Sequence, residues 1–232
     1  MEEFKVILAQ DLRQATSKQA EDNRALLSAK GITALNLIGS PGAGKTSILE
    51  ATMACLAGEI KLGVIEGDIA TSRDAARLAK WNVPVVQINT AGACHLDAKL
   101  IAAALSELPL EELELLFIEN VGNLVCPAEF DLGEDFKVGI LSVAEGSDKP
   151  LKYPLVFQEA RALILNKIDL LPYTDFDLEA FQLEVQRLNP YLKILPLSAR
   201  TKQGLEDWCT WLKQLVASKK VPNTGYGATA LL

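Results

Sequence analysis

The stretch GSPGAGKT, Gly39 to Thr46, decides the fold, because it matches the pattern G-x-x-x-x-G-K-S/T. It follows an apolar run over residues 32–38 and precedes a segment of helical periodicity over residues 46–57. Glycines in such a turn let successive backbone N–H groups point at one phosphate, and the N-terminus of the following helix adds positive potential. The stretch therefore predicts the phosphate-binding loop of a P-loop NTPase.

Two side chains of this loop have separate expected roles. Lys45 should reach the β- and γ-phosphates, and the hydroxyl of Thr46 should bind Mg²⁺. The residues expected to contact the phosphates are Gly39, Gly42, Ala43, Gly44, Lys45, Thr46 and Ser47.

The remaining periodicity predicts an α/β fold, a mostly parallel sheet with helices on both faces. The predicted strands are 32–38, 61–66, 83–88, 113–119, 136–143, 162–166 and 192–197. The predicted helices are 46–57, 72–81, 96–107, 155–159, 178–188 and 205–217. We expect three parts along the chain: an N-terminal helical extension over 1–30, the P-loop domain over 31–218, and a flexible tail over 219–232. The polar face of the extension at Asp22, Asn23 and Arg24 is expected to be solvated.

Composition excludes several classes of partner. The chain has 232 residues and a formal net charge of −7, which disfavours nucleic acid as an electrostatic partner. The acidic opening Met1-Glu2-Glu3 lacks the basic region of a signal peptide, and no apolar run approaches the roughly 18 residues of a membrane span. Four scattered cysteines suggest no disulfide framework. We therefore expect a cytoplasmic, reducing location without a membrane contact.

The tetrapeptide NKID, residues 166–169, predicts which base is bound. A carboxylate at Asp169 can accept hydrogen bonds from the ring N–H and the exocyclic amine of guanine, a donor pair that adenine lacks. Lys167 should lie along the base plane, and Asn166 should tie this loop to the phosphate side. This pattern favours GTP over ATP.

A second turn supports guanine. Ser198, Ala199 and Arg200 follow a predicted strand and resemble the S-A-K turn whose backbone N–H contacts guanine O6, with arginine in place of lysine. A small-molecule kinase is disfavoured, because NKID indicates a regulatory GTPase and no acceptor-site motif is visible. Hydrolysis of GTP to GDP and phosphate is the expected reaction.

The stretch ENVG, Glu119 to Gly122, stands where small GTPases have D-x-x-G. Glu119 should supply a carboxylate to the Mg²⁺ shell, and Gly122 could turn its N–H onto the γ-phosphate. The next residue is asparagine, not the glutamine that positions water in many GTPases. Asp68 and Asp74 are the nearest candidates for orienting the attacking water, and the alternative for each is a helix N-cap or first-turn charge.

Cys94, His95 and Cys126 form a candidate metal site. His95 is the only histidine in the chain and follows Cys94 directly. Two thiolates and one imidazole suit Zn²⁺ or Ni²⁺, and we expect a helix N-terminus to lower the pKa of Cys94. The alternative is that both thiols are ordinary buried cysteines. The other two cysteines, Cys55 and Cys209, are expected in the apolar core.

Six stretches resemble the HypB family, GTPases that help insert nickel into nickel–iron hydrogenase. They are GSPGAGKT, EGDIATSRD (66–74), CHLDA (94–98), ENVGNLVC (119–126), DKPLKYP (148–154) and NKID. The similarity runs from about residue 5 to residue 217. It implies GTP-dependent dimerisation, a metal site in the GTPase domain, and work beside a nickel chaperone and the maturation machinery of the hydrogenase large subunit. Some members begin with a C-x-x-C-G-C motif or a histidine-rich tract; with neither here, the metal function is expected to rest on the domain itself.

The same resemblance suggests Lys149 as a residue that reaches the nucleotide of a dimer partner, with Lys152 second. The alternative is a solvated basic pair. Two other functions stay open: a metal-binding storage or adaptor protein that nucleotide merely stabilises, and a related GTPase for another metalloenzyme.

Overall fold

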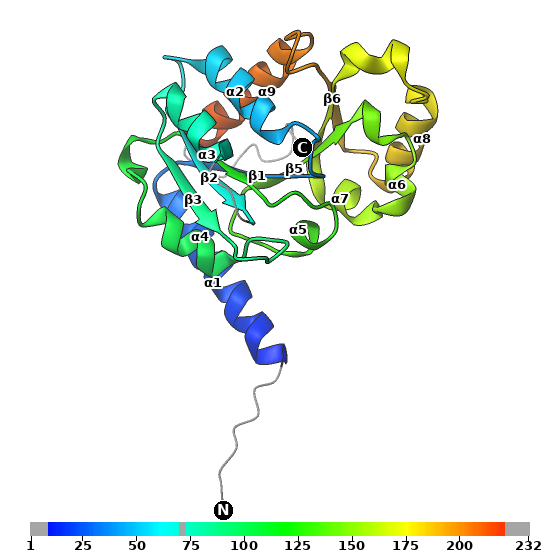
Figure 1. Cartoon of the computed structure of the whole chain (residues 1–232). Coiled ribbons are helices and arrows are strands. Elements are labelled where there is room, and N and C mark those ends of the chain that lie inside the picture. The colour runs from blue at the N-terminus through cyan, green and yellow to red at the C-terminus, as the bar shows by residue number, and fades with distance from the viewer. Residues whose placement is uncertain (1–8, 70–72, 221–232) are drawn as a thin grey trace, which may run out of the picture.

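The structure, a computed structural model, describes residues 9–69 and 73–220 (Figure 1). Within them, seven strands form one sheet in the order β3-β2-β4-β1-β5-β6-β7, and every pairing is parallel. The strands are β1 (Thr33–Gly39), β2 (Leu62–Asp68), β3 (Val85–Asn89), β4 (Leu115–Glu119), β5 (Phe136–Ser142), β6 (Ala160–Asn166) and β7 (Lys193–Pro196). The predicted P-loop NTPase fold class is therefore confirmed.

Helices cover both faces of the sheet. One face carries α2 (Lys45–Leu56), α3 (Arg73–Leu78) and α9 (Leu205–Lys220), which pack on inward side chains such as Leu35 and Phe117. The helices that supply buried side chains to the other face are α1 (Ala9–Ala29), α4 (Ala98–Leu105), α5 (Cys126–Glu129), α7 (Pro154–Glu159) and α8 (Leu178–Leu188). The sheet is thus the middle of three layers, as a parallel sheet requires.

Short elements complete the chain. They are α6 (Lys149–Lys152) and the 3₁₀ helices η1 (Ala79–Trp81), η2 (Leu110–Glu112), η3 (Val143–Glu145) and η4 (Ile168–Tyr173). From β1 the chain first builds β2 and β3 on one side of the sheet, and later builds β5, β6 and β7 on the other side. The carboxyl end of β1 therefore lies where the strand order reverses, the place where open α/β sheets bind ligands.

Each predicted strand is present, with ends that differ by at most two residues. Helix α9 continues through Lys220, so residues 219 and 220 of the expected tail are helical. The remainder of that tail and residues 1–8 lie outside the described part of the chain. Among the described helices, none combines the length and the apolar character that a membrane crossing requires.

Two expectations were wrong. Asn23 is not solvated but 2% exposed, and its amide donates to the carbonyl oxygens of Ala98 and Leu132, which ties α1 to the body of the domain. The structure also pairs Cys55 of α2 with Cys209 of α9 as a disulfide, with Cα atoms 6.7 Å apart. The two residues are 154 positions apart in sequence, but α2 and α9 pack side by side on one face of the sheet.

Candidate nucleotide and metal site

The predicted phosphate loop connects β1 to α2 at the carboxyl edge of the sheet. A Cβ on Gly39 would lie 2.5 Å from the carbonyl oxygen of Ile140, and a Cβ on Gly44 would lie 2.4 Å from Nδ2 of Asn166. Gly44 also has a φ of +99°, in the left-handed region. Glycine is therefore required at both positions, at Gly39 by the close backbone of β5 and at Gly44 by its left-handed conformation and the nearby Asn166 side chain.

Lys45 is the first residue of α2 and is only 8% exposed. Its Nζ donates to the carbonyl oxygens of Gly39, at 3.0 Å, and Ser40, at 3.4 Å. Burial lowers the pKa of Lys45, although the carboxylate of Glu119 opposes this effect. The ammonium group is thus held along the loop by weak carbonyl partners that phosphate oxygens could replace.

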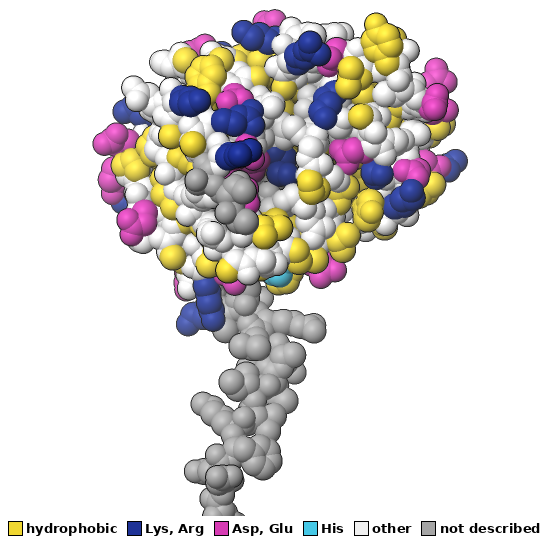
Figure 2. Space-filling view, viewed as in Figure 1, with side chains coloured by type: hydrophobic (Ala, Val, Ile, Leu, Met, Phe, Trp, Pro, Cys, Tyr) yellow, Lys and Arg dark blue, Asp and Glu magenta, His cyan; other side chains and the backbone are white. Residues whose placement is uncertain are grey.

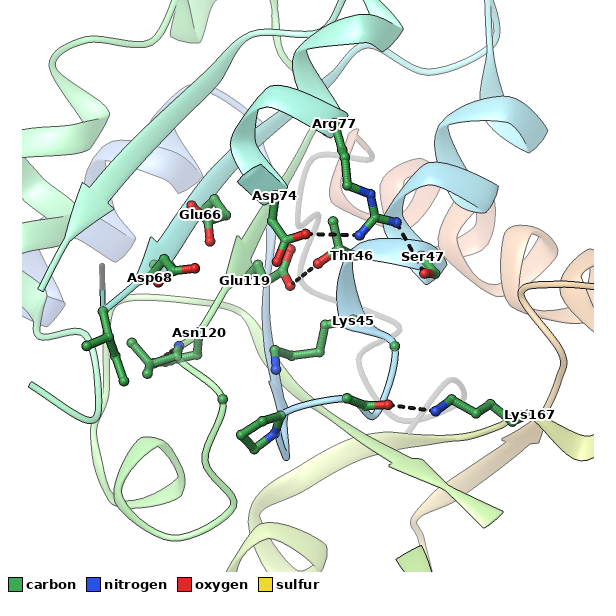
Figure 3. Close-up of a pocket in the computed structure, with 17 residues that line it drawn as sticks. Lys45, Thr46, Ser47, Glu66, Asp68, Asp74, Arg77, Glu119, Asn120 and Lys167 are labelled. Atoms are coloured by element: carbon green, nitrogen blue, oxygen red, sulfur yellow. Dashed lines mark hydrogen bonds and ion pairs between the residues drawn. The ribbon is translucent and has the colours of Figure 1, made fainter. Parts of the chain in front are cut away.

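A cavity of about 470 Å³ opens beside the loop, a size within the range of small-molecule sites. Figure 3 shows the carboxylates of Glu66, Asp68, Asp74 and Glu119 gathered on one side of Lys45. In Figure 2, basic and acidic side chains stand next to one another around the middle of the face that holds this cavity. Of the predicted site residues, it is lined by Gly42, Gly44, Lys45, Thr46, Ser47, Asp68, Asp74, Glu119, Gly122 and Lys167.

Glu66 and Glu119 occupy paired positions on the neighbouring strands β2 and β4. Their exposed fractions are 2% and 4%. Burial, with the nearby charge of Glu119, raises the pKa of Glu66 to about 8. Burial also raises the pKa of Glu119 to about 7, although Lys45 and the Thr46 hydroxyl oppose it. Two carboxyl groups are therefore held where their ionised forms are costly.

The same carboxyl groups fit a hard divalent cation. Thr46 Oγ1 donates to Glu119 Oε1 at 2.8 Å, which places the two predicted Mg²⁺ ligands together. Oε2 of Glu119 and Oε2 of Glu66 are buried and have no hydrogen-bond partner. Oxygen ligands and unpaired buried carboxylate atoms are what Mg²⁺ would satisfy, and it would supply positive charge to the transferred phosphoryl group. Sequence reasoning missed Glu66, because only the register of β2 against β4 shows that it adjoins Glu119.

The raised pKa of Glu66 predicts how stability depends on pH in the absence of nucleotide and metal. The folded chain favours the protonated form of Glu66. The contribution of this group to the free energy of unfolding is therefore fully present below pH 4.5 and is lost as the pH rises through about 8. Glu66→Gln keeps the shape but cannot ionise. At pH 9 its free energy of unfolding should exceed that of the parent by at least about 1.4 kcal/mol, the equivalent of one pKa unit.

Urea unfolding at pH 5 and pH 9 measures this difference, which should shrink at the lower pH. The matched control is Glu206→Gln, an exposed position in α9. An equal difference between Glu66→Gln and the parent at both pH values would show that ionisation of Glu66 does not cost stability.

Asp74 lies in the first turn of α3 and also lines the cavity. Its Oδ1 accepts from Nη1 of Arg77 at 2.9 Å, and Arg77 Nη2 donates to Ser47 Oγ at 3.3 Å. Arg77 also forms an ion pair with Glu50. These contacts join α3 to α2 across the rim of the cavity. Sequence reasoning missed Arg77, which carries no motif of its own.

The predicted guanine loops, residues 166–169 and 198–200, contact the phosphate loop through the side chains of Asn166 and Lys167. Asn166 Nδ2 donates to the carbonyl oxygen of Ala43 at 2.9 Å, while its Oδ1 accepts from Lys167 N at 2.8 Å and Ala199 N at 3.2 Å. Lys167 Nζ donates to the carbonyl oxygen of Gly42 at 2.7 Å. The structure therefore brings the predicted guanine loops and the phosphate loop together.

Asp169 lies in η4, half-buried, and its Oδ1 is buried without a hydrogen-bond partner. Ser198 is fully buried, and its Oγ accepts from Thr201 N at 3.1 Å, which closes the turn. Ala199 and Arg200 line a second cavity of about 460 Å³ beside α2. An acceptor without a partner, next to a fixed turn, is the arrangement that a guanine edge would complete.

Cys94, His95 and Cys126 also come together. Their candidate ligand atoms all lie within 4.8 Å of one another. Cys94 Sγ is 3.7 Å from His95 Nδ1, close to the ~3.6 Å that tetrahedral bonds of about 2.3 Å to sulfur and 2.1 Å to nitrogen would give. Three such ligands fit Zn²⁺ or Ni²⁺ and leave a fourth position open.

The surroundings of this metal site differ from expectation in two respects. Helix α4 begins at Ala98 and is capped by Asp97, so Cys94 lies outside the helix terminus. The pKa of Cys94 is raised rather than lowered, because its thiol faces Cys126. The ring of His95 stacks on Phe130 at 3.9 Å, a contact that orients the imidazole and that no motif indicated.

Lys149 lies in α6, outside the lining of the nucleotide cavity, with its Nζ 3.8 Å from Asp148 Oδ1. Asp148 also forms an ion pair with Lys152. Within a single subunit, neither lysine belongs to the phosphate site.

The chain is similar to known proteins over most of its length. The family described as "CobW/HypB/UreG, nucleotide-binding domain" matches residues 33–196. The hydrogenase maturation factor HypB of Azotobacter vinelandii is 50% identical over 207 residues, which cover 89% of this chain and 68% of that protein. The crystal structure of HypB from Helicobacter pylori in complex with nickel is similar, with a TM-score of 0.85 and 36% identity over 94% of this chain and 100% of that one. HypB from Archaeoglobus fulgidus has a TM-score of 0.82 and 35% identity, over 88% of this chain and 99% of the other.

Proposed function

Because the chain belongs to the HypB hydrogenase maturation factors within the CobW/HypB/UreG family, we propose that it is a GTP-hydrolysing metallochaperone. It binds GTP or GDP with Mg²⁺ in the cavity beside Lys45, and it binds nickel or zinc at Cys94, His95 and Cys126. It hands nickel on for insertion into nickel–iron hydrogenase.

The observation that carries this proposal is the three-ligand cluster next to the nucleotide cavity. All three ligand atoms are within 4.8 Å of one another, and the segment that leads to Cys126 begins at Glu119 and passes along the cavity at Asn120, Val121 and Gly122. Nucleotide-dependent movement of this segment would shift Cys126 relative to the Cys94-His95 pair. Metal affinity would then depend on the nucleotide.

Metal titration tests the proposal. We expect Cys94→Ala and His95→Ala to lose most Ni²⁺ and Zn²⁺ binding while GTP binding persists, and Cys126→Ala to keep some metal but lose the difference between the GDP state and a GTP-analogue state. The control is the double variant Cys55→Ala/Cys209→Ala, which removes two sulfurs away from the cluster. A parent with the same metal affinity in both states would leave a storage or adaptor protein as the better description.

The active form proposed here is a homodimer in the GTP state. Three ligands per subunit leave a tetrahedral position open, which a second subunit could fill. Lys149 stays the candidate for reaching the partner's nucleotide. Sedimentation with a GTP analogue should give a dimer for the parent and a monomer for Lys149→Ala, and a dimer from both would remove Lys149 from this role.

The proposed protein partners are a nickel chaperone and the maturation machinery of the hydrogenase large subunit. Support comes from the relatives, which are hydrogenase maturation factors. Pull-down of the tagged chain from cells that make the hydrogenase, with and without GTP analogue, tests this part. The cytoplasmic location stays a prediction that fractionation of the same cells would test.

A further inference from the structure

One buried side chain connects the nucleotide cavity to the metal loop. Asn120 is 1% exposed and lines the cavity at the end of β4. Its Oδ1 accepts two backbone hydrogen bonds, from Val121 N at 3.0 Å and from Leu96 N at 3.2 Å. Leu96 directly follows His95, so a single oxygen atom holds the backbone of both segments.

The other end of this amide is anchored to the sheet. Asn120 Nδ2 donates to Asn36 Oδ1 at 3.1 Å, and Asn36 Nδ2 donates to Glu134 Oε1 at 3.2 Å. Asn36 lies in β1 and is fully buried. Because the amide is fixed to the central strand, Oδ1 cannot follow one backbone partner without changing its bond to the other.

On the nucleotide side, the segment that follows Asn120 contacts the phosphate loop. A Cβ on Gly122 would lie 2.9 Å from Cγ and 3.1 Å from N of Pro41, so the two backbones touch. A β-bridge also pairs Gly39 with Asn123. Any shift of the phosphate loop on binding a third phosphate must therefore also displace the backbone at Val121 and Gly122.

On the metal side, Leu96 has little freedom. It is fully buried and packs against Gly67 of β2, where a Cβ would lie 2.9 Å from Leu96 Cδ1. Asn123 adds a weaker link, since its Nδ2 donates to the carbonyl oxygen of Cys94 at 3.4 Å. A change at Asn120 Oδ1 therefore reaches the backbone next to His95.

We propose that Asn120 is the positioning residue that couples nucleotide state to metal affinity, by holding the N–H groups of Leu96 and Val121 on one oxygen. The proposal rests on the proposed function and adds how its two sites communicate. Coupling through Asn120 moves the Cys94-His95 pair relative to Cys126, whereas coupling through the chain alone would move only Cys126. Because linkage is reciprocal, metal must change the affinity for the GTP state by the same factor.

The test compares Ni²⁺ affinity with GDP and with a GTP analogue in the parent and Asn120→Ala. We expect the parent to show a ratio of at least about 5-fold between the two states, and Asn120→Ala to show a ratio within a factor of about two of unity, while both ligands still bind. The matched control is Asn189→Ala, a C-cap residue of α8 whose Nδ2 donates to the backbone carbonyl oxygens of Phe157, Gln158 and Ala160. It should keep the parental ratio.

Hydrogen exchange on the parent protein gives a second measurement that does not depend on the folding of a variant. Adding Ni²⁺ to the GDP-bound protein should change exchange at the Leu96 and Val121 amides together, while Leu100 N, capped by Asp97, stays constant. A parental ratio in Asn120→Ala, or a change at only one of the two amides, overturns the role of Asn120 and leaves the proposed function standing. A ratio of unity in the parent overturns the coupled function and this proposal with it.

Discussion

Replacing Lys45 with alanine is expected to abolish GTP hydrolysis, a loss of at least about 10³-fold in turnover rate. Lys45 Nζ is held 3.0 Å from the Gly39 carbonyl oxygen, on the inner side of the phosphate loop. Its charge would lie on the β- and γ-phosphate oxygens, where negative charge develops during transfer. Lys167 and Arg77 also line the cavity, but Lys167 Nζ donates to the carbonyl oxygen of Gly42, and the Arg77 guanidinium binds Asp74, Ser47 and Glu50.

The fold should tolerate this change. Burial lowers the pKa of Lys45, which means that the folded chain gains little from the ammonium group itself. Turnover at saturating GTP and thermal unfolding should be measured together, with Lys193→Ala, an exposed position of β7, as the matched control. Undiminished hydrolysis in folded Lys45→Ala would refute the assignment of the phosphate loop.

Much of the architecture could be predicted because its signals are local. Buried parallel strands appear as continuous apolar runs, and the phosphate-loop and NKID stretches each sit at the end of such a run. The helix over residues 178–188 was predicted with the bounds that α8 has, because Asp177 caps it and its apolar residues follow a helical period. Short elements such as α5 and α6 were missed, since four residues are too few to show a period.

The missed site residues depend on contacts between distant segments. Glu66 matters because β2 pairs with β4 in a register that sets it beside Glu119. Phe130 matters because α5 and its following turn return to the metal loop, where its ring meets His95. The wrong expectation for Asn23 has the same origin, since its partners at Ala98 and Leu132 are 75 and 109 positions away. Periodicity in the sequence predicts which face of a helix or strand carries a side chain, but only the packed structure shows which residues that side chain contacts.

The pKa of Cys94 shows how a contact with a distant residue can outweigh an expectation drawn from the neighbouring sequence. A thiol at a helix N-terminus has a lowered pKa, and the sequence places Cys94 just before a helical segment. In the structure three residues separate Cys94 from α4, and the thiol of Cys126 faces that of Cys94, so the pKa of Cys94 shifts upward. A cation bound between Cys94 and Cys126 would reverse this effect, because it would stabilise the thiolate form of its cysteine ligands.

Replacing Asp169 with asparagine is expected to weaken GDP and GTP binding by about 10²-fold or more. Asp169 Oδ1 is buried and has no hydrogen-bond partner within the described chain, so its capacity to accept a hydrogen bond is unused. The carboxylate can accept from the ring N–H and the amine of guanine at once. The amide of asparagine has only one oxygen, so its own NH₂ group would face one of these two guanine donors. The substitution keeps the volume of the side chain and removes no hydrogen bond, so the fold should be unchanged.

The same geometry predicts a gain as well as a loss. Xanthine carries a carbonyl where guanine carries its amine, and the amide of Asp169→Asn can donate to that oxygen while its own oxygen accepts from the ring N–H. Titrations with fluorescent GDP and XDP should therefore show the preference for guanine shrinking or reversing in the variant. Asp177→Asn, the same chemical change at the N-cap of α8, should leave both affinities unchanged. If Asp169→Asn binds GDP as tightly as the parent does, the base is read elsewhere, and η4 is only a structural turn.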